Sequence, residues 1–255
     1  MKKYSTVDKA NYFTELRRTE SAAGAFNIHY MPEDIHEAYT IQKLVIEQLQ
    51  NKVLGWKLGG TNPKTQAIFK CDSGYLGPIF SIGETTPTYF DNEKLRGEAE
   101  LTFRISKEIY NLNMNNILDS PLIYFDAVYP SIEFPHSQIN NFHEVGMLPL
   151  IADLCGTGHL VVGQSIDIME MPDKPVDAKV KLATSELARG NSANLVGSYQ
   201  TALSDFLKLV LEYSLRIAPG QLVASGGITD CIFLPKHEKI DVEFSGFEAF
   251  TYQYI

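Results

Sequence analysis

The sequence has few cysteines, no long apolar run and no concentrated positive charge, and each absence excludes a class of protein. Its cysteines, Cys71, Cys155 and Cys231, are odd in number and widely spaced, which argues against a disulfide framework and favours a reducing cytoplasm. No segment approaches the roughly 18 consecutive apolar residues of a membrane-spanning helix. The two lysines near the N-terminus precede no apolar stretch of a secretory signal. The formal charge of −9, with its 22 basic residues scattered, excludes the positive footprint of a nucleic-acid-binding protein. We therefore expect a cytoplasmic protein with no membrane or nucleic-acid partner.

Several familiar catalytic motifs are also missing. Residues 59–65 lack the Gly-Lys-Ser/Thr ending of a phosphate-binding P-loop. The glycines within residues 155–158 precede an apolar run instead of following one, so a dinucleotide site is not indicated. No Gly-x-Ser-x-Gly elbow supports a serine hydrolase, and the six histidines have no metal-type spacing. We therefore expect the chemistry to depend on other residue types.

Length and apolar content predict a globular protein. A chain of 255 residues with 44% hydrophobic residues can bury one sizeable core or two small ones. Apolar residues recur at helical spacing over about residues 34–50 and again over about residues 202–215. No internal repeat or flexible linker divides the chain.

The rest of the chain is dominated by strand patterns. Residues 56–190 read mostly as short strands separated by turns. The alternation of apolar and polar residues is clearest at 101–105 and 176–182. Further strands are predicted near the C-terminus, at 221–224 and on both sides of 245–246. This order predicts an α+β fold, with a helical N-terminal portion over 1–55 and a β-rich body over 56–255.

Two glutamates stand two positions apart in one predicted strand. Residues i and i+2 of a strand point to the same face, so Glu98 and Glu100 share one side while alternate apolar residues line the other. Two carboxylates this close repel each other unless a cation lies between them, and oxygen-rich sites suit hard ions such as Mg²⁺ or Mn²⁺. The alternative is a half-exposed strand with a solvated acidic face, and the spacing by itself leaves both interpretations open.

Two further charged residues, Glu133 and Lys57, lie in segments whose sequence pattern does not call for a charge. Glu133 lies between apolar residues in a segment that Pro130 marks as an edge strand or as irregular. A charge in such surroundings is costly unless it is paired or bound to metal, although a strand-end glutamate can also reach solvent. Lys57 stands among the glycines of residues 55–60, which allow a backbone to approach a ligand closely. A solvated lysine is the alternative there.

Taken in order, these segments resemble the fumarylacetoacetate hydrolase superfamily, and specifically its 2-keto-4-pentenoate hydratase and 4-oxalocrotonate decarboxylase branch. The resemblance covers roughly residues 34–255 and depends on the order and spacing of short motifs. They are a helix motif at 37–42, a Gly-x-Lys-x-Gly-x-Thr loop at 55–61, the Glu-x-Glu pair at 98–100, Pro-Ser-Ile-Glu at 130–133, Ala152-Asp153 followed by Gly158 and Gly163, Ser225-Gly226-Gly227 after Gly220, and the segment 244–247.

The resemblance implies a mixed, rolled β-sheet body of the fumarylacetoacetate hydrolase type with flanking helices. It implies a Mg²⁺ or Mn²⁺ ion that chelates a 2-oxo acid and acts as a Lewis acid on it. Lys57 carries over as the proton-transfer or charge-stabilising group, and a bound cation would favour its neutral, basic form. The metal ligands implied by the resemblance are Glu98, Glu100 and Glu133, and the substrate-binding residues are Leu58, Thr61, Asp153 and Ser225.

Two departures from the family pattern bear on the reaction. Tyr75, expected to be catalytic, stands where the hydratases usually have an acidic residue, and Ser198-Tyr199 replaces a turn that often contains Gly-His-Pro or Gly-Asp-Pro. A tyrosine, with its pKa near 10, is normally a proton donor, so we expect weak hydratase activity unless another group such as Asp72 takes over. Decarboxylation needs no base for the leaving CO₂.

We therefore expect a metal-dependent lyase of small 2-oxo acids, either a hydratase or a decarboxylase of a 2-oxo dicarboxylate. One alternative is an acylpyruvate-type carbon–carbon hydrolase, which usually needs a His–Glu pair that the sequence does not indicate. The other is a non-catalytic relative that binds a small acid. Relatives also imply a homo-oligomer, and the 13 tyrosines and 14 phenylalanines, several of them in 244–254, are a modest hint of an interface.

Overall fold

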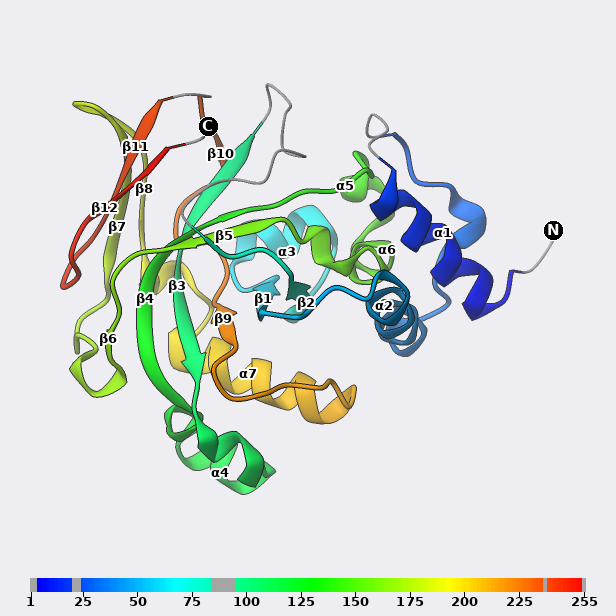
Figure 1. Ribbon diagram of the computed structural model, residues 1–255, viewed down its shortest axis with the longest axis horizontal. Helices are drawn as coiled ribbons and strands as arrows, with labels where there is room; N and C mark the ends of the chain where they lie inside the picture. The colour runs from blue at the N-terminus through cyan, green and yellow to red at the C-terminus, as the bar shows by residue number, and fades with distance from the viewer. Residues whose placement is uncertain (1–3, 20–23, 84–94, 236–237, 254–255) are drawn as a thin grey trace.

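The computed structural model describes residues 4–19, 24–83, 95–235 and 238–253. Helices and strands occupy different parts of the molecule (Figure 1). The N-terminal helices lie at one end, a small sheet lies at the other, and a larger curled sheet runs between them. Every helix in the described part of the chain is too short or too polar to span a membrane. The arrangement confirms the α+β fold expected from the sequence.

The helices begin and end at local sequence signals. The Ser5 hydroxyl and the Asp8 carboxylate form a reciprocal capping box at the start of the first helix, and Asp34 caps the second. That second helix matches the helix predicted over 34–50. The α-helices are α1 (Thr6–Arg18), α2 (Ile35–Leu49), α3 (Pro63–Phe69), α4 (Met114–Asp119), α5 (Phe142–Val145), α6 (Met147–Ala152) and α7 (Tyr199–Glu212). The 3₁₀ helices are η1 (Ile28–Tyr30), η3 (Lys107–Asn111), η4 (Pro121–Tyr124), η5 (Leu154–Gly156), η6 (Ile168–Glu170) and η7 (Ser192–Asn194).

Two helix predictions need correction. The helix predicted over about 202–215 begins three residues earlier, because the Ser198 hydroxyl accepts a hydrogen bond from the Thr201 backbone and caps α7. It ends at Glu212, before the last apolar residue of the predicted stripe. Helices α3 to α6 lie within 56–190, where the sequence predicts mostly strands. They are four to seven residues long, too short for helical periodicity to show.

The strands form two sheets within the described residues. Their bounds are β1 (Gly55–Gly59), β2 (Tyr75–Ile79), β3 (Arg96–Ile105), β4 (Phe125–Phe134), β5 (His159–Val162), β6 (Ile166–Asp167), β7 (Asp177–Leu182), β8 (Ser185–Asn191), β9 (Leu222–Ala224), β10 (Ile232–Phe233), β11 (Lys239–Phe244) and β12 (Phe250–Gln253). The larger sheet has the order β2-β1-β9-β3-β4-β5, with β10 paired to β3 and β6 paired to β4. The smaller sheet is antiparallel, with the order β12-β11-β7-β8.

The long antiparallel pair β3 and β4 lies at the centre of the larger sheet. The prediction that Pro130 marks an edge or irregular strand is wrong, because β4 pairs with β3 on one side and with β5 and β6 on the other. The Pro130 carbonyl accepts a hydrogen bond from the Gly163 backbone, so the proline nitrogen faces the same side, in the gap between the β5 and β6 pairings. No ladder hydrogen bond to β3 is lost there.

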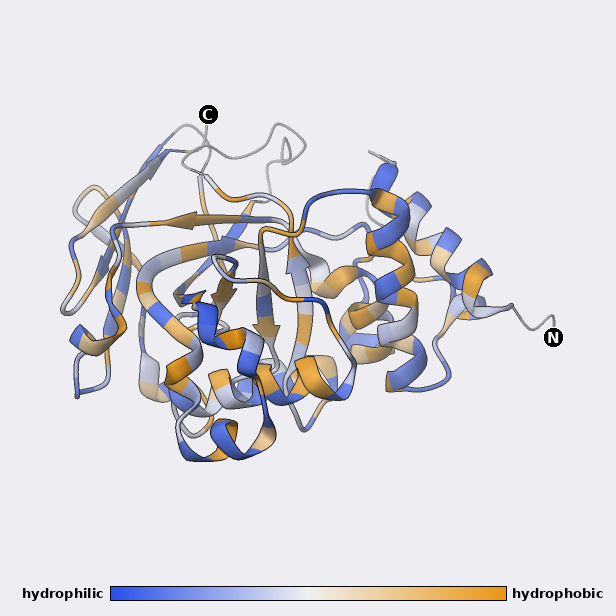
Figure 2. Ribbon diagram, turned by 60° about the horizontal axis from the view of Figure 1, so that its bottom comes forward, coloured by the Kyte–Doolittle hydropathy of each residue, from blue (hydrophilic) through white to orange (hydrophobic). Residues whose placement is uncertain are grey.

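Both faces of β3 are covered. The apolar face packs on α7, where the ring centroids of Phe103 and Tyr199 are 5.8 Å apart. Along the outer elements, hydrophilic and hydrophobic residues alternate (Figure 2), as expected where an element buries one face. The small sheet packs against the end of β4 through Tyr252, whose ring lies 4.8 Å from that of Phe134. Tyr252 and Phe244 are buried, so these C-terminal aromatic residues serve the core; Tyr254 lies outside the described residues. The homo-oligomer stays a prediction.

Candidate metal centre

Three glutamates from the two central strands converge on the face of the sheet opposite α7. Glu98 of β3 directly faces Glu133 of β4, and Glu100 lies two residues further along β3. Residues i and i+2, and residues that face each other across an antiparallel pair, share one face of a sheet. One carboxylate oxygen from each glutamate lies within 4.8 Å of the others. The structure therefore brings together the three residues named as metal ligands from the sequence.

The cluster is not a solvated acidic surface. Glu100 and Glu133 are buried and Glu98 is half-buried, so the solvated-face interpretation is wrong for this strand. Burial, with the charge of Glu133, raises the pKa of Glu98 to about 7. Burial and the neighbouring carboxylates raise the pKa of Glu100 well above its usual value. The pKa of Glu133 is raised by burial, against the lowering effect of Lys57. Burial and mutual repulsion therefore favour the protonated forms of these carboxyl groups, and a bound cation would favour the ionised forms.

Unpartnered oxygens in the cluster fit a metal ion. One Glu100 oxygen accepts a hydrogen bond of 2.9 Å from the Gly226 backbone, but its other oxygen and one oxygen of Glu133 are buried without a hydrogen-bond partner. Such orphaned buried acceptors are costly unless a cation or donor meets them. A donor set made of carboxylate oxygens suits Mg²⁺, Mn²⁺ or Ca²⁺ rather than softer ions. The residues present therefore fit a hard divalent cation.

Lys57 completes the charge balance of the cluster. It projects from β1, is buried, and its Nζ donates a hydrogen bond of 2.8 Å to Glu133. Three ionised carboxylates and one ammonium group leave a formal charge of −2, which a divalent cation would neutralise. Burial lowers the pKa of Lys57, but the charge and hydrogen bond of Glu133 outweigh burial and raise that pKa above its usual value. The surrounding acids thus favour the charged ammonium form, opposite to the effect expected from a bound cation.

Thr61 and Ser225 lie beside the cluster, and Leu58 contributes mainly to the core. Gly226 has a φ of +92°, and a Cβ added there would collide with the Thr61 hydroxyl, so the turn needs glycine and the two residues are in close contact. The Thr61 hydroxyl is buried without a hydrogen-bond partner. Ser225 is fully buried and its backbone nitrogen bonds to Leu101. The Leu58 side chain is part of the hydrophobic core.

Asp153 is engaged elsewhere. Asp153 is the residue that follows α6, and it is fully buried. Its carboxylate accepts a hydrogen bond of 2.8 Å from Arg17 of α1 and another from Ser137. The same guanidinium also donates to backbone carbonyls of His136 and Thr157. Arg17 therefore fastens the N-terminal helix to the body of the protein. A substrate-binding role for Asp153 stays a prediction, and its described contacts are structural.

Tyr75 is enclosed next to Lys57. In the β1–β2 pairing Tyr75 faces Gly59 and Gly77 faces Lys57, so Tyr75 and Lys57 project from the same face. A side chain at Gly59 would collide with the Tyr75 ring, which shows that this ring lies directly over the glycine. Burial is the largest of the effects that raise the pKa of Tyr75 well above its usual value. The phenol therefore stays protonated. Asp72, its possible substitute, is exposed.

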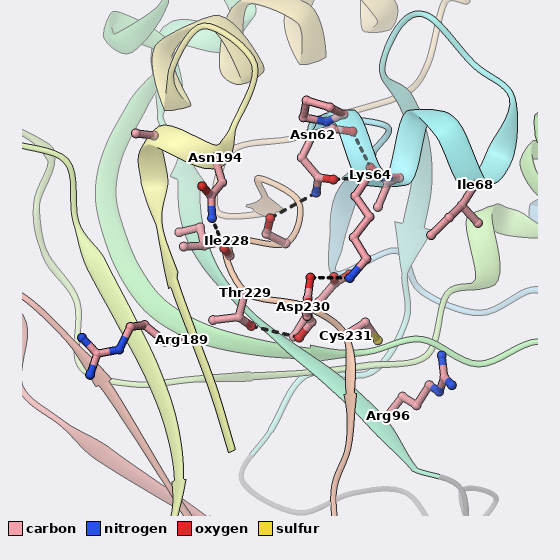
Figure 3. Close-up of a pocket in the computed structure, with 15 residues that line it drawn as sticks. Asn62, Lys64, Ile68, Arg96, Arg189, Asn194, Ile228, Thr229, Asp230 and Cys231 are labelled. Atoms are coloured by element: carbon pink, nitrogen blue, oxygen red, sulfur yellow. Dashed lines mark hydrogen bonds and ion pairs between the residues drawn. The ribbon is translucent and has the colours of Figure 1, made fainter. Parts of the chain in front are cut away.

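A pocket of about 680 Å³ gives access to Glu98, and its other lining residues were missed in the sequence (Figure 3). The segment 227–231 forms one wall and is held by the Asn62 and Asn194 amides, which donate to the carbonyls of Gly227 and Ile228. Basic side chains also line it, and these are Lys64, Arg96 and Arg189. Arg96 could have been placed from the sequence, because it stands two positions before Glu98 on the same strand and therefore shares its face.

No model of a known protein family matches the sequence. Among solved structures, the chain is similar to 4-oxalocrotonate decarboxylase from Pseudomonas putida G7 complexed with magnesium and adipate, with a TM-score of 0.83 and 18% identity over 100% of both chains. The same enzyme complexed with calcium and acetate gives a TM-score of 0.81 at 17% identity, again over 100% of both chains. Fumarylpyruvate hydrolase from Pseudomonas aeruginosa, in complex with Mn²⁺ and pyruvate, gives 0.55 at 9% identity over 80% of this chain and 90% of that one. These likenesses confirm that the chain has the fold of the fumarylacetoacetate hydrolase type that the resemblance implied.

Proposed function

We propose that this protein is a divalent-metal-dependent lyase acting on a small 2-oxo acid. The observation that carries the proposal is the convergence of Glu98, Glu100 and Glu133, with two buried oxygens left unpartnered. Enzymes that share the fold have been crystallised with magnesium, calcium or manganese and with small carboxylic acids. The three glutamates would hold the ion here. When bound, it supplies a Lewis acid that stabilises negative charge developing on the 2-oxo oxygen.

The surrounding side chains supply donors for an acidic substrate. The Lys57 ammonium lies at the rim of the cluster, where it holds a proton within reach of an acid bound beside Glu133. The buried Thr61 hydroxyl has no partner in the protein, so a substrate carboxylate that accepts its hydrogen bond would relieve the cost of its burial. Both groups favour an anionic ligand at this place.

Tyr75 favours decarboxylation over hydration. A buried phenol with a raised pKa keeps its proton, so it does not remove a proton from water near neutral pH. In decarboxylation, the bond to the departing carboxylate breaks, its electron pair stays on the substrate, and a proton from a donor completes the product. Hydration additionally needs a group that directs water to the distal carbon. We therefore infer a 2-oxo dicarboxylate decarboxylase as the finer activity, with hydratase activity weak.

A carbon–carbon hydrolase is the less favoured alternative. That reaction needs a base for water, usually a histidine paired with a carboxylate. In the described part of the chain, the ion pair of this kind joins His143 and Glu144, and both side chains are largely exposed on α5. This pair is therefore not placed to activate water at the glutamate cluster.

Turnover of a panel of 2-oxo acids in the presence of Mg²⁺ or Mn²⁺ tests the proposal. Loss of the conjugated 2-oxo-alkenoate absorbance reports any reaction, and product analysis separates decarboxylation, hydration and carbon–carbon cleavage. Glu133→Gln should abolish activity, whereas the matched control Glu243→Gln, in the small sheet, should not. Metal binding without turnover of any 2-oxo acid would overturn the enzymatic assignment and favour a non-catalytic acid-binding protein.

A further inference from the structure

The basic side chains that line the pocket differ in how they are paired. Lys64 forms an ion pair of 2.6 Å with Asp230. Arg189 makes two hydrogen bonds, of 2.8 and 2.7 Å, to Glu186. Arg96 has no carboxylate partner among the described residues. Arg96 is exposed, so its charge is available to an anion that enters the pocket.

Arg96 is held in place by an aromatic ring. Its guanidinium lies 4.1 Å from the centroid of the Phe233 ring, and the two residues face each other across the β3–β10 pairing. A guanidinium that stacks on an aromatic ring uses its flat face, so the N–H groups at its edge stay available for a bidentate contact with a carboxylate. This contact orders the long side chain before any ligand binds, which reduces the entropy cost of binding.

The position of Arg96 relates it directly to the metal cluster. It precedes Glu98 by two residues on β3, so both project from the same face with a spacing of roughly 7 Å along the strand. Glu98 and Arg96 both line the pocket, and Figure 3 shows Arg96 on the side of Cys231 and Ile68, across from Arg189. A short acid that meets the cluster with one end would extend along this face toward the guanidinium with the other.

We propose that Arg96 is a specificity-determining residue that binds the distal carboxylate of the substrate, so that this site prefers 2-oxo dicarboxylates to 2-oxo monocarboxylates. The inference rests on the proposed function, because it takes the 2-oxo end of the substrate to lie at the glutamate cluster. The pairing with a carboxylate explains why an arginine without a carboxylate partner stands beside three acids, and why Phe233 of the neighbouring strand β10 holds it.

Two acids of equal chain length test this assignment, one by turnover and one by inhibition. The specificity constant kcat/KM is measured for a 2-oxo-hexenedioate, and the inhibition constant is measured for the matching 2-oxo-hexenoate, which has no distal carboxylate to lose as CO₂. Both are measured with wild-type protein and with Arg96→Gln. Loss of a charge-assisted bidentate contact should lower kcat/KM for the dicarboxylate about tenfold to a hundredfold, mainly through KM, and change the inhibition constant of the monocarboxylate by less than about twofold. Arg104→Gln, which alters an arginine of the same strand that pairs with Asp126 and does not line the pocket, should leave both values near wild type. An equal loss for both acids, or no loss, would overturn the assignment.

A binding measurement separates this inference from the proposed function. Calorimetry with Mg²⁺-loaded protein compares 2-oxoadipate with 2-oxohexanoate, neither of which needs to react. Wild type should bind the dicarboxylate more tightly, Arg96→Gln should lose that preference, and Arg96→Lys should keep part of it. If no 2-oxo acid is turned over, the lyase assignment fails while this comparison still tests Arg96. Equal affinity of wild type for the two acids would refute the role of Arg96 even in an active enzyme.

Discussion

Replacement of Glu100 by glutamine separates the charge of the cluster from its shape. The glutamine oxygen can still accept the hydrogen bond from the Gly226 backbone, which is 2.9 Å long in the present structure. The negative charge that repels Glu98 and Glu133 is lost, and so is one anionic metal ligand. We therefore expect opposite effects: Glu100→Gln should stabilise the metal-free protein and remove most of the stabilisation that a metal provides.

The geometry sets the size of both effects. The ligand oxygens lie within 4.8 Å of one another, and two unit charges at that separation repel by about 3.5 kcal/mol at an effective dielectric constant of about 20. Partial protonation already relieves some of this repulsion, so we expect a gain of about 1–2 kcal/mol in the free energy of unfolding without metal. For a chain of 255 residues this is a rise in Tm of roughly 3–6 °C. A metal ion at a hundredfold excess over its Kd adds about 2.7 kcal/mol to the wild type, or roughly 5–10 °C.

Thermal unfolding at pH 8, with chelator and with excess Mg²⁺ or Mn²⁺, measures both quantities in one experiment. The matched control is Glu243→Gln, which removes a carboxylate that pairs with Lys181 in the small sheet and should keep the full metal-induced rise. A Glu100→Gln protein that retains the full rise would refute the ligand assignment. A Glu100→Gln protein less stable than wild type without metal would refute the repulsion argument.

Three further predictions concern pH and buried ion pairs. The pKa of Glu98 is raised to about 7, so the folded metal-free protein holds a proton that the unfolded chain releases above about pH 4.5. The free energy of unfolding, measured in urea with chelator, should therefore fall by about 2 kcal/mol between pH 5 and pH 8. A flat or rising profile would contradict this. Lys57→Met should lower turnover by about a hundredfold. It should also cost the metal-free protein about 1–2 kcal/mol because Glu133 loses its partner, and unchanged turnover on the identified substrate would remove Lys57 from the mechanism. Arg17→Met should cost about 3 kcal/mol in chemical denaturation because Asp153 stays buried without its cation, and an unchanged midpoint would show that the pair contributes nothing.

Local periodicity was enough for the elements that are long and alternate regularly between apolar and polar residues. The stripe in α2 and the alternation in β3 and β7 are repeated often enough to identify each element. The same alternation placed Glu98 and Glu100 on one face. Helices such as α5, with four residues, give no such repeat. Pro130 misled the strand assignment, because a proline is tolerated in a central strand when its nitrogen faces a gap between neighbours.

The parts of the site that depend on pairing between distant segments did not follow from the residues alone. Glu133 became a ligand candidate only through the resemblance, because nothing local fixes the β3–β4 register that places it opposite Glu98. The ion pair between Arg17 and Asp153 joins residues 136 positions apart, so Asp153 could not be recognised as a structural residue. Arg96 was overlooked although the i, i+2 rule that related the two glutamates applied equally to it.

The order of strands in the larger sheet has a consequence for the newly made chain. β1 and β3 do not touch each other in the sheet, because β9, from residues 222–224, lies between them and pairs with both. While the ribosome is still adding the segment before residue 222, the strand that carries Lys57 and the strand that carries Glu98 and Glu100 have no shared neighbour. Long-range strand pairing of this kind forms late, because the loop entropy must be overcome before the contacts compensate. The acids and the lysine therefore meet only after most of the protein has been synthesised, and nascent chains that lack β9 should not turn over substrate.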